Sequence, residues 1–382
     1  MRSGVNCIIY YSAIFNCLRM SVGATSSIYL LSRGITLVEL GVLKSLQSII
    51  FFALDIPTSY LSDKYSRKYA FIIASLFGGF WLIVTGISKS IEWFLFAEIL
   101  NSISLTIIGG VVYSYIIDNS GESSNSIPLL NRVNKIQFLL MAISSIIGAI
   151  VYHFEPMLIW LISGGLCIAL SILGLWVLPE PIIKKSSVKI SFISSLKGSV
   201  FMGRDLLLEG VNLSILLVIF QVLLQYWQVM VVDSFDFNNS IFYGAVFSLI
   251  LLSQSISGHV SSFFEGKRGN TTISFILISC FLLLFLSFYL NLKYVFLSTL
   301  IVSFGVIQSN LAIARGSYHK LTTPHSRSIQ ESIVTTFSKL LSIIILPLVA
   351  FISEKTQWWG ALLFLAVLCI LNVIITSRRV LE

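Results

Sequence analysis

Several ionisable side chains interrupt otherwise apolar stretches, and these residues are the ones best suited to chemistry. Arg19 and Glu98 lie within two long apolar segments, and Lys44 lies in a third, at a depth similar to that of Glu98. Ionisable groups in such segments are costly and usually face a protein interior or a water-filled path. We predict that Arg19 and Glu98 bind a small molecule and that Glu98 also takes up and releases protons, with Lys44 as a competing partner of Glu98.

Amide side chains form a second candidate site, at helical spacing along one face of an apolar segment. They are Gln221, Gln225 and Gln228. Such a stripe can hydrogen-bond a polar substrate, or it can bridge neighbouring helices, and the sequence leaves both interpretations open. Lys339 lies in the middle of a later segment, on one helix face with Glu331 and Thr335. We include Lys339 and the three glutamines among the predicted substrate-binding residues.

Motifs for catalysis, metal binding and ATP use are missing from the sequence. The histidines are not at metal-ligand spacing with one another or with a cysteine, and the five cysteines all fall in apolar stretches without a CxxC pair. Neither a phosphate-binding GxxxxGK[ST] loop nor a nucleophile elbow occurs. We therefore expect no enzyme activity, no metal and no cofactor.

The composition identifies the elements that must position these side chains. Of 382 residues, 56% are hydrophobic and 11% are charged, and the mean hydropathy is +0.92. A soluble domain carries about 25% charged residues. Apolar segments long enough to cross a bilayer as helices recur along the whole chain. We predict an all-α membrane protein with twelve transmembrane helices, over residues 5–32, 37–61, 70–88, 91–117, 136–152, 157–178, 207–232, 240–262, 272–290, 294–314, 328–352 and 357–377.

The basic residues indicate the topology. Most of the 25 lysines and arginines fall in alternate connecting segments, and the net charge of +8 is spread between apolar segments instead of forming a nucleic-acid-binding patch. Because Lys and Arg are retained on the cytoplasmic side, this pattern predicts that both termini are cytoplasmic. The expected partners are a lipid bilayer, a small molecule and protons, with no nucleic acid.

A long polar and basic interruption near the middle of the chain divides it into two six-helix halves. We predict an N-terminal half over 1–178, a cytoplasmic linker over 179–206 and a C-terminal half over 207–382. A degenerate repeat supports the division, because SYLSDKYSRK after the second segment resembles SSFFEGKRGN after the eighth. Repeated halves with a substrate site between them are common in secondary transporters.

The most specific motif is DIPTSYLSDKYSRK, which covers residues 55–68. It resembles the loop signature of the major facilitator superfamily, approximately G-x-L-x-D-[RK]-x-G-[RK]-[RK]. Serines replace both glycines of that signature, at Ser59 and Ser66, while the charges are kept. The acid, Pro and Thr at its start and the segment over 96–121 resemble bacterial drug-efflux-like members.

The resemblance implies a conformational gate and a function. In this family the loop holds the two halves together on the cytoplasmic side, and charge-assisted hydrogen bonds that form in one state suit that role. The corresponding gate residues are Asp55, Asp63, Lys64, Arg67, Lys68 and Asp118. The family also places the helices that carry Arg19 and Glu98 around a central cavity.

We therefore expect a secondary active transporter that exports a drug, an antibiotic or a metabolite by proton antiport with alternating access. It is expected to be monomeric and to lie in a bacterial inner membrane. The family's antiporter signature of the fifth span is missing around Gly148. Import of a small polar solute, or a non-transporting sensor or immunity protein on the same fold, is the alternative.

Overall fold

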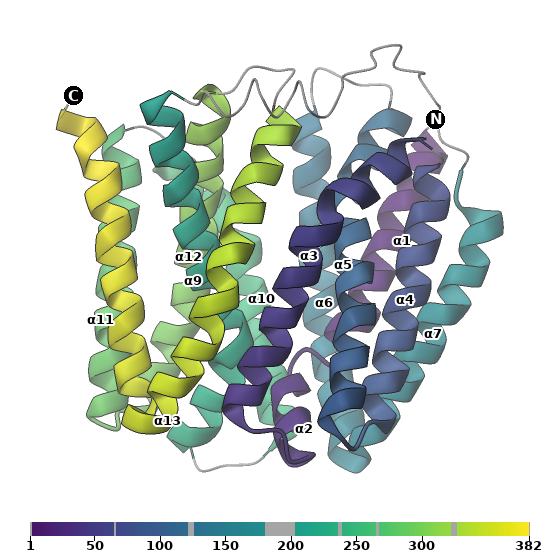
Figure 1. Cartoon of the computed structure of the whole chain (residues 1–382), viewed down its shortest axis with the longest axis horizontal. Helices are drawn as coiled ribbons and strands as arrows, with labels where there is room; N and C mark the ends of the chain where they lie inside the picture. Colours follow the sequence, from purple (N-terminus) through teal and green to yellow (C-terminus); the bar gives the residue numbers. More distant parts are fainter. Residues whose placement is uncertain are drawn as a thin grey trace. The chain divides into compact units, whose positions relative to one another are not determined.

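The structure is a computed structural model, and it describes residues 2–64, 66–120, 126–179, 203–235, 239–264, 267–321 and 327–381. The described part of the chain is built of helices (Figure 1). The elements are α1 Arg2–Met20, α2 Ser26–Ser32, α3 Leu37–Lys64, α4 Arg67–Ile87, α5 Ile91–Ser120, α6 Ser126–Phe154, α7 Pro156–Val177, α9 Arg204–Phe235, α10 Ser240–Phe263, α11 Lys267–Tyr289, α12 Lys293–Leu321 and α13 Arg327–Leu381. Most of the predicted linker lies outside the described residues.

The helices confirm an all-α membrane protein, because 10 of them are long and apolar enough to cross a bilayer. Three predicted spans differ in detail. The span predicted over 5–32 is broken into α1 and α2. The last two predicted spans run together in α13, which is interrupted at Gln357, where φ is 60° and ψ is −172°.

Large apolar side chains cover much of the outer surface of these helices. Trp176 is 73% exposed, Ile344 is 69% exposed and Ile147 is 56% exposed. Contiguous apolar surface of this kind is rare in water-soluble monomers. It suits helices whose outer faces contact lipid, and this supports the assignment as a multi-pass membrane protein.

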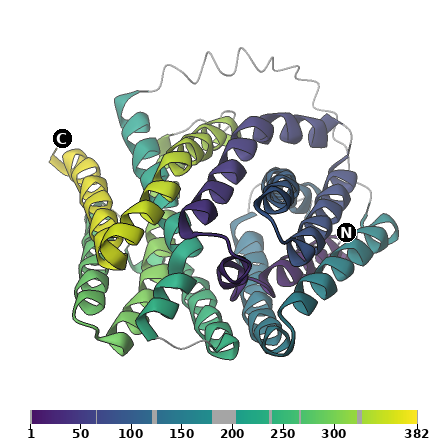
Figure 2. The same ribbon diagram turned by 60° about the horizontal axis from the view of Figure 1, so that its bottom comes forward.

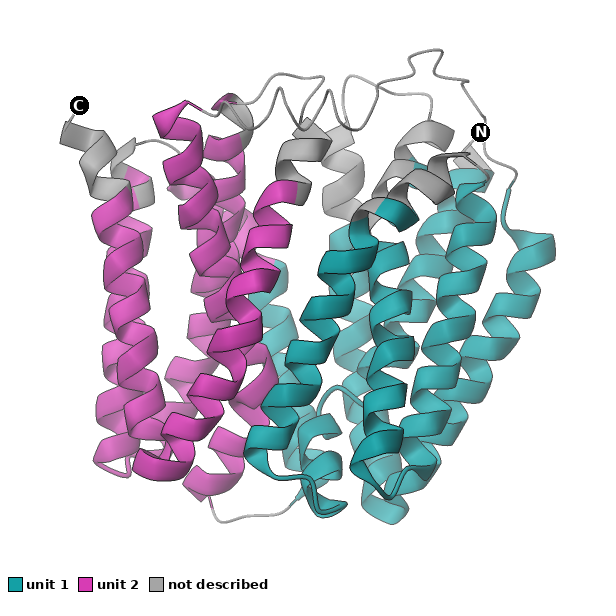
Figure 3. Ribbon diagram, viewed as in Figure 1, with its two compact units in different colours: residues 1–184, 237–255 teal, residues 185–236, 256–382 magenta. Residues whose placement is uncertain are grey.

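The described helices belong to two compact units, shown in teal and magenta in Figure 3. The first comprises residues 1–184 together with 237–255, and the second comprises 185–236 together with 256–382. The first therefore contains α1 to α7 and most of α10, and the second contains α9 and α11 to α13. The boundaries predicted from the sequence, 1–178 and 207–382, stay a prediction about the family's two halves.

Helix α5 lies among α1, α3 and α4 within the first unit, as the more nearly end-on view of Figure 2 shows. Helix α4 also packs closely on α7 through two glycines. A Cβ atom on Gly79 would lie 2.9 Å from the carbonyl oxygen of Gly164, and the reverse distance is the same. Small residues of this kind let membrane helices approach closely, which explains the close packing of α4 on α7.

The break after α1 is stabilised by neighbouring helices. Short-range backbone bonds replace the regular helix, with Gly23 N–H donating to Met20 O at 3.0 Å and Thr25 N–H donating to Val22 O at 3.1 Å. The Ser21 and Ser163 hydroxyls lie 2.7 Å apart. Because short-range backbone bonds satisfy part of the turn locally, an apolar run with small residues can end α1 inside the predicted span.

Gly148 of α6 lies directly against this break. A Cβ atom there would collide with the carbonyl oxygen of Ser21, which is backbone and cannot move aside. We expect Gly148→Ala to destabilise the protein by about 1–3 kcal/mol, as overpacking does in protein cores. Thermal unfolding in detergent would measure the effect. Gly165→Ala is the matched control, since no atom lies within 4 Å of its added Cβ; equal losses for the two variants would contradict the prediction.

Candidate functional site

Glu98 of α5 forms an ion pair with Lys44 of α3. The Lys44 ammonium lies 2.7 Å from Glu98 Oε1, and the two side chains are 14% and 6% exposed. It is the single salt bridge found among the described residues. The sequence placed Lys44 at the same depth as Glu98, and the structure brings the two into direct contact.

Asn101 joins this ion pair to Arg19. One turn after Glu98 on α5, its amide N–H donates to Glu98 Oε2 at 3.0 Å. Its carbonyl oxygen accepts a hydrogen bond from Arg19 Nη2 at 2.5 Å. We call Arg19, Lys44, Glu98 and Asn101 the Arg19 cluster. It links three helices, α1, α3 and α5, through charged and amide groups.

Arg19 is a buried guanidinium held between aromatic rings. It is 5% exposed, and its Cζ lies 4.5 Å from the ring centroid of Trp81 and 5.6 Å from that of Phe15. Its Nη1 donates to the Ser104 hydroxyl at 3.4 Å. Arg19 also lies in the last turn of α1, where the helix dipole favours a cation.

The predicted pair of Arg19 and Glu98 is therefore brought together through a third residue. Sequence reasoning expected a loose pairing through a water or a substrate, and it missed Asn101. A signal was present, because Asn101 follows Glu98 at the i+3 spacing that puts two side chains on one helix face. Trp81 was also missed, since a tryptophan in an apolar helix is ordinarily a packing residue.

The second unit contains a smaller polar group around Gln221 of α9. Lys339 of α13 donates to Gln221 Oε1 at 2.9 Å, and the Ser342 hydroxyl donates to the same oxygen at 3.3 Å. Gln228 is buried and Gln225 is partly buried. The carbonyl oxygen of Gln221 thus bridges two helices, which favours the helix-bridging interpretation for this glutamine.

A third buried polar group was not anticipated. Glu209, Asn212 and Asn372 are at most 3% exposed. Asn212 donates to Glu209 Oε2 at 3.4 Å, and the Asn372 amide donates to the backbone carbonyl of Asn212 at 3.2 Å. Glu209 is an ionisable residue within the predicted span over 207–232, and this position could have identified it as a buried polar residue.

The predicted gate falls partly outside the described residues. Asp55 is 8% exposed and Lys68 is 7% exposed, and both are described together with Arg67. The side chains of three other predicted gate residues lie outside the described part, namely those of Asp63, Lys64 and Asp118. The side chain of Glu331, which was predicted to share a helix face with Lys339, also lies outside the described part. The gate accordingly stays a prediction.

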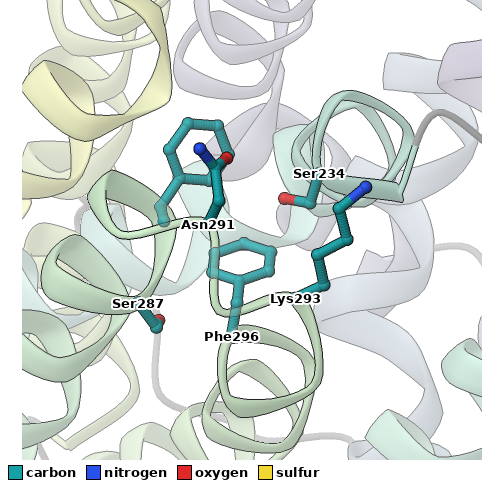
Figure 4. A pocket seen from close by; sticks show the side chains of 6 residues that line it. Ser234, Ser287, Asn291, Lys293 and Phe296 are labelled. Carbon is teal, nitrogen blue, oxygen red and sulfur yellow. The ribbon is translucent and has the colours of Figure 1, made fainter.

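A small pocket of the second unit lies where α9 and α11 end and α12 begins (Figure 4). It is lined by Ser234, Ser287, Phe288, Asn291, Lys293 and Phe296. None of these was predicted to bind substrate. Among the described residues, no group of three or more His, Cys, Asp and Glu side chains is arranged to hold a metal ion.

The apolar helices and the buried ionisable clusters define a polytopic membrane protein of the secondary-transporter class. The chain belongs to the Major Facilitator Superfamily, whose family model matches residues 8–320. Family and fold point to a transporter rather than an enzyme. No curated protein matches the sequence.

Solved structures share the fold over nearly the whole chain. A variant of the nucleoside transporter NupG superposes with a TM-score of 0.80 at 16% identity, covering 98% of this chain and 99% of that one. A bacterial homologue of the human lysosomal transporter Spinster superposes with a TM-score of 0.79 at 12% identity, covering 97% and 95%. At these identities the likeness shows the fold alone.

Proposed function

We propose that this chain moves a small molecule across a bacterial inner membrane by alternating access and that Glu98 couples the movement to protons. The observation that carries the proposal is the Arg19 cluster, in which the buried Glu98 carboxylate lies between an ammonium and an amide-linked guanidinium. Such a carboxylate can exchange a proton for its cation partners as the protein changes conformation. Both termini are cytoplasmic and the transporter is a monomer in this proposal.

Export by proton antiport is the first candidate, because the loop over 55–68 resembles that of drug-efflux-like members. In this proposal the gate residues named above close the cytoplasmic side when the transporter opens outward. Arg19, Glu98, Gln225, Gln228 and Lys339 contact the substrate. Gln221 does so only when it releases Lys339 and Ser342, which occupy its carbonyl oxygen in the described conformation.

Import together with protons is the second candidate, and one observation favours it. The Arg19 cluster contains two cations and one carboxylate, so a proton on Glu98 would increase its positive charge and strengthen the binding of an anion. Joint binding of proton and substrate is the thermodynamic requirement for co-transport. The fold of a nucleoside transporter supports a polar solute in this role.

Accumulation assays separate the two directions. Cells that express the chain would be exposed to fluorescent drugs, amphipathic antibiotics and radiolabelled nucleosides, with and without a protonophore. Export predicts at least one compound whose accumulation falls until the protonophore is added. Import predicts at least one whose accumulation rises and then collapses with the protonophore.

Asp63→Asn is the matched gate variant, since it removes one charge and keeps the size of the side chain. We expect Asp63→Asn to abolish the fall in accumulation that export predicts, or the rise that import predicts. No change for any compound in wild-type cells would contradict the proposed transport, and it would favour the non-transporting sensor. A change that persists in the protonophore would contradict the coupling to protons.

A further inference from the structure

Arg19 has more hydrogen-bond donors than acceptors around it. A guanidinium carries five N–H donors, and two of those of Arg19 are used, both toward neutral oxygens of Asn101 and Ser104. Among the described residues, no carboxylate lies within ion-pair distance of Arg19, because the cluster's carboxylate is paired with Lys44. A buried arginine without an anionic partner is costly inside a membrane protein, so its retention suggests an anion from outside the chain.

The surroundings of Arg19 also suit an oxyanion. The Arg19 Cζ lies over the Trp81 ring, 4.5 Å from its centroid, and a guanidinium packed on an aromatic ring keeps N–H donors available for a planar acceptor. The indole Nε1 of Trp81 is buried and has no hydrogen-bond partner in the described part of the chain. Arg19 and Trp81 thus supply donors, and a carboxylate or phosphate group would supply the missing acceptors and charge.

The orientation of the Asn101 amide connects the anion site at Arg19 to the proton site at Glu98. While Glu98 is ionised, the Asn101 N–H faces Glu98 and the Asn101 carbonyl oxygen faces Arg19. A proton on Glu98 Oε2 would replace an acceptor by a donor, and the Asn101 amide would have to turn to accept it. The Asn101 N–H groups would then face Arg19. The Arg19 N–H that had been bonded to the Asn101 carbonyl oxygen would lose this acceptor and become available to a ligand.

Other groups that face this pair come from neighbouring helices. Lys44 of α3 contacts Glu98 Oε1, so the proton is best accommodated on the other oxygen, which Asn101 contacts. Cys167 of α7, a buried neutral thiol, belongs to the same packed cluster as Phe15 and Trp81. Lys44 is the one group among these that adds a positive charge beside Glu98, and its charge also favours an anionic ligand.

We propose that the transported substrate carries a carboxylate or phosphate group bound by Arg19, and that the Asn101 amide makes this binding depend on the proton at Glu98. The inference rests on the second form of the proposed function, co-transport of the substrate with protons, and specifies its substrate class. Arg19 is the ligand-contacting residue, and Asn101 is a positioning residue. In the described conformation Arg19 is buried, so the anion reaches it when alternating access opens the site.

Thermal-shift binding in detergent tests the anion. The purified chain would be screened with metabolite anions paired with neutral counterparts, such as nicotinate with nicotinamide for a carboxylate and uridine monophosphate with uridine for a phosphate. We expect an anion to raise the unfolding temperature where its neutral counterpart does not. Arg19→Gln should weaken that binding on the order of 100-fold, as expected when one partner of a buried charge-assisted contact is removed. Arg19→Lys should recover part of it.

Arg33→Gln is the matched control, because Arg33 also stacks on an aromatic ring, 4.9 Å from the centroid of Tyr29, but lies outside the Arg19 cluster. It should bind the anion as wild type does. Stabilisation by the neutral counterparts alone, no stabilisation by any anion, or unchanged anion binding in Arg19→Gln would each overturn the proposal.

Asn101→Leu and Asn101→Ser test the link to the proton. Wild-type affinity for the anion should rise on going from a mildly alkaline to a mildly acidic buffer. Both variants should bind the anion with an affinity that no longer follows pH, an effect that a merely structural role would not produce. A pH dependence as steep as that of wild type in both variants would refute the role of Asn101.

The outcome for this inference is separable from that for transport. Anion binding that depends on Arg19, without gradient-driven transport of any anion, would support the inference and contradict the proposed function. Gradient-driven transport of neutral or cationic compounds that persists in Arg19→Gln would support the function and overturn the inference.

Discussion

Glu98→Gln is expected to abolish accumulation of substrate against its gradient while leaving exchange of substrate across the membrane intact. The carboxamide is close in size to the carboxylate and can still accept a hydrogen bond from Lys44, but it cannot carry a proton. Without a proton site, a substrate gradient can still be equalised but cannot be built from a pH gradient. Proteoliposomes with an imposed pH gradient would measure accumulation, and counterflow with labelled substrate would measure exchange.

Glu92→Gln is the control, since Glu92 lies on the same helix but is exposed at its first turn. It should accumulate substrate as wild type does. Accumulation at the wild-type rate and extent in Glu98→Gln would remove Glu98 from the coupling mechanism. Loss of exchange together with accumulation would show that substrate binding or folding requires the Glu98 carboxylate, and it would contradict the expected separation of coupling from exchange.

The sequence was sufficient for the fold because apolar segments of bilayer length leave few alternatives to helices. It also singled out Arg19 and Glu98, which the structure buries, since an ionisable residue in such a segment stands out by its type; their functional roles stay predictions. The interruption of the first span was not predicted. One backbone carbonyl beside it, Cys17 O, accepts a hydrogen bond from the Ser144 hydroxyl of α6 at 2.7 Å, and such partners are set by packing.

Which polar residues contact one another was harder to predict than which residues belong to the polar clusters. Counting residues along two helices gives the depth of each side chain, but not which faces meet, so Lys44 and Arg19 were both possible partners of Glu98. The helix packing decides for Lys44, because α3 and α5 lie side by side. Asn101 carries no charge, so only its i+3 spacing from Glu98 pointed to it, although it is the residue through which Arg19 reaches Glu98.

Lys44→Met is expected to destabilise the protein strongly, whereas the double variant Lys44→Met with Glu98→Gln is expected to recover most of the loss. Removing one partner of a buried ion pair leaves an uncompensated charge and costs about 3–5 kcal/mol, while replacing both partners by neutral groups is often close to neutral. Glu98 is the more buried partner, so the loss of Lys44 should cost more than Glu98→Gln alone. The unfolding temperature in detergent would measure all three variants.

Lys89→Met makes the same chemical change at an exposed position between α4 and α5 and should have little effect. If the double variant were as unstable as Lys44→Met, packing of the lysine side chain would be responsible, and the charge argument would fail. Recovery of stability without recovery of gradient-driven accumulation is the expected result. It would separate the two roles of the ion pair, since the pair's charges would then be dispensable for folding but required for coupling.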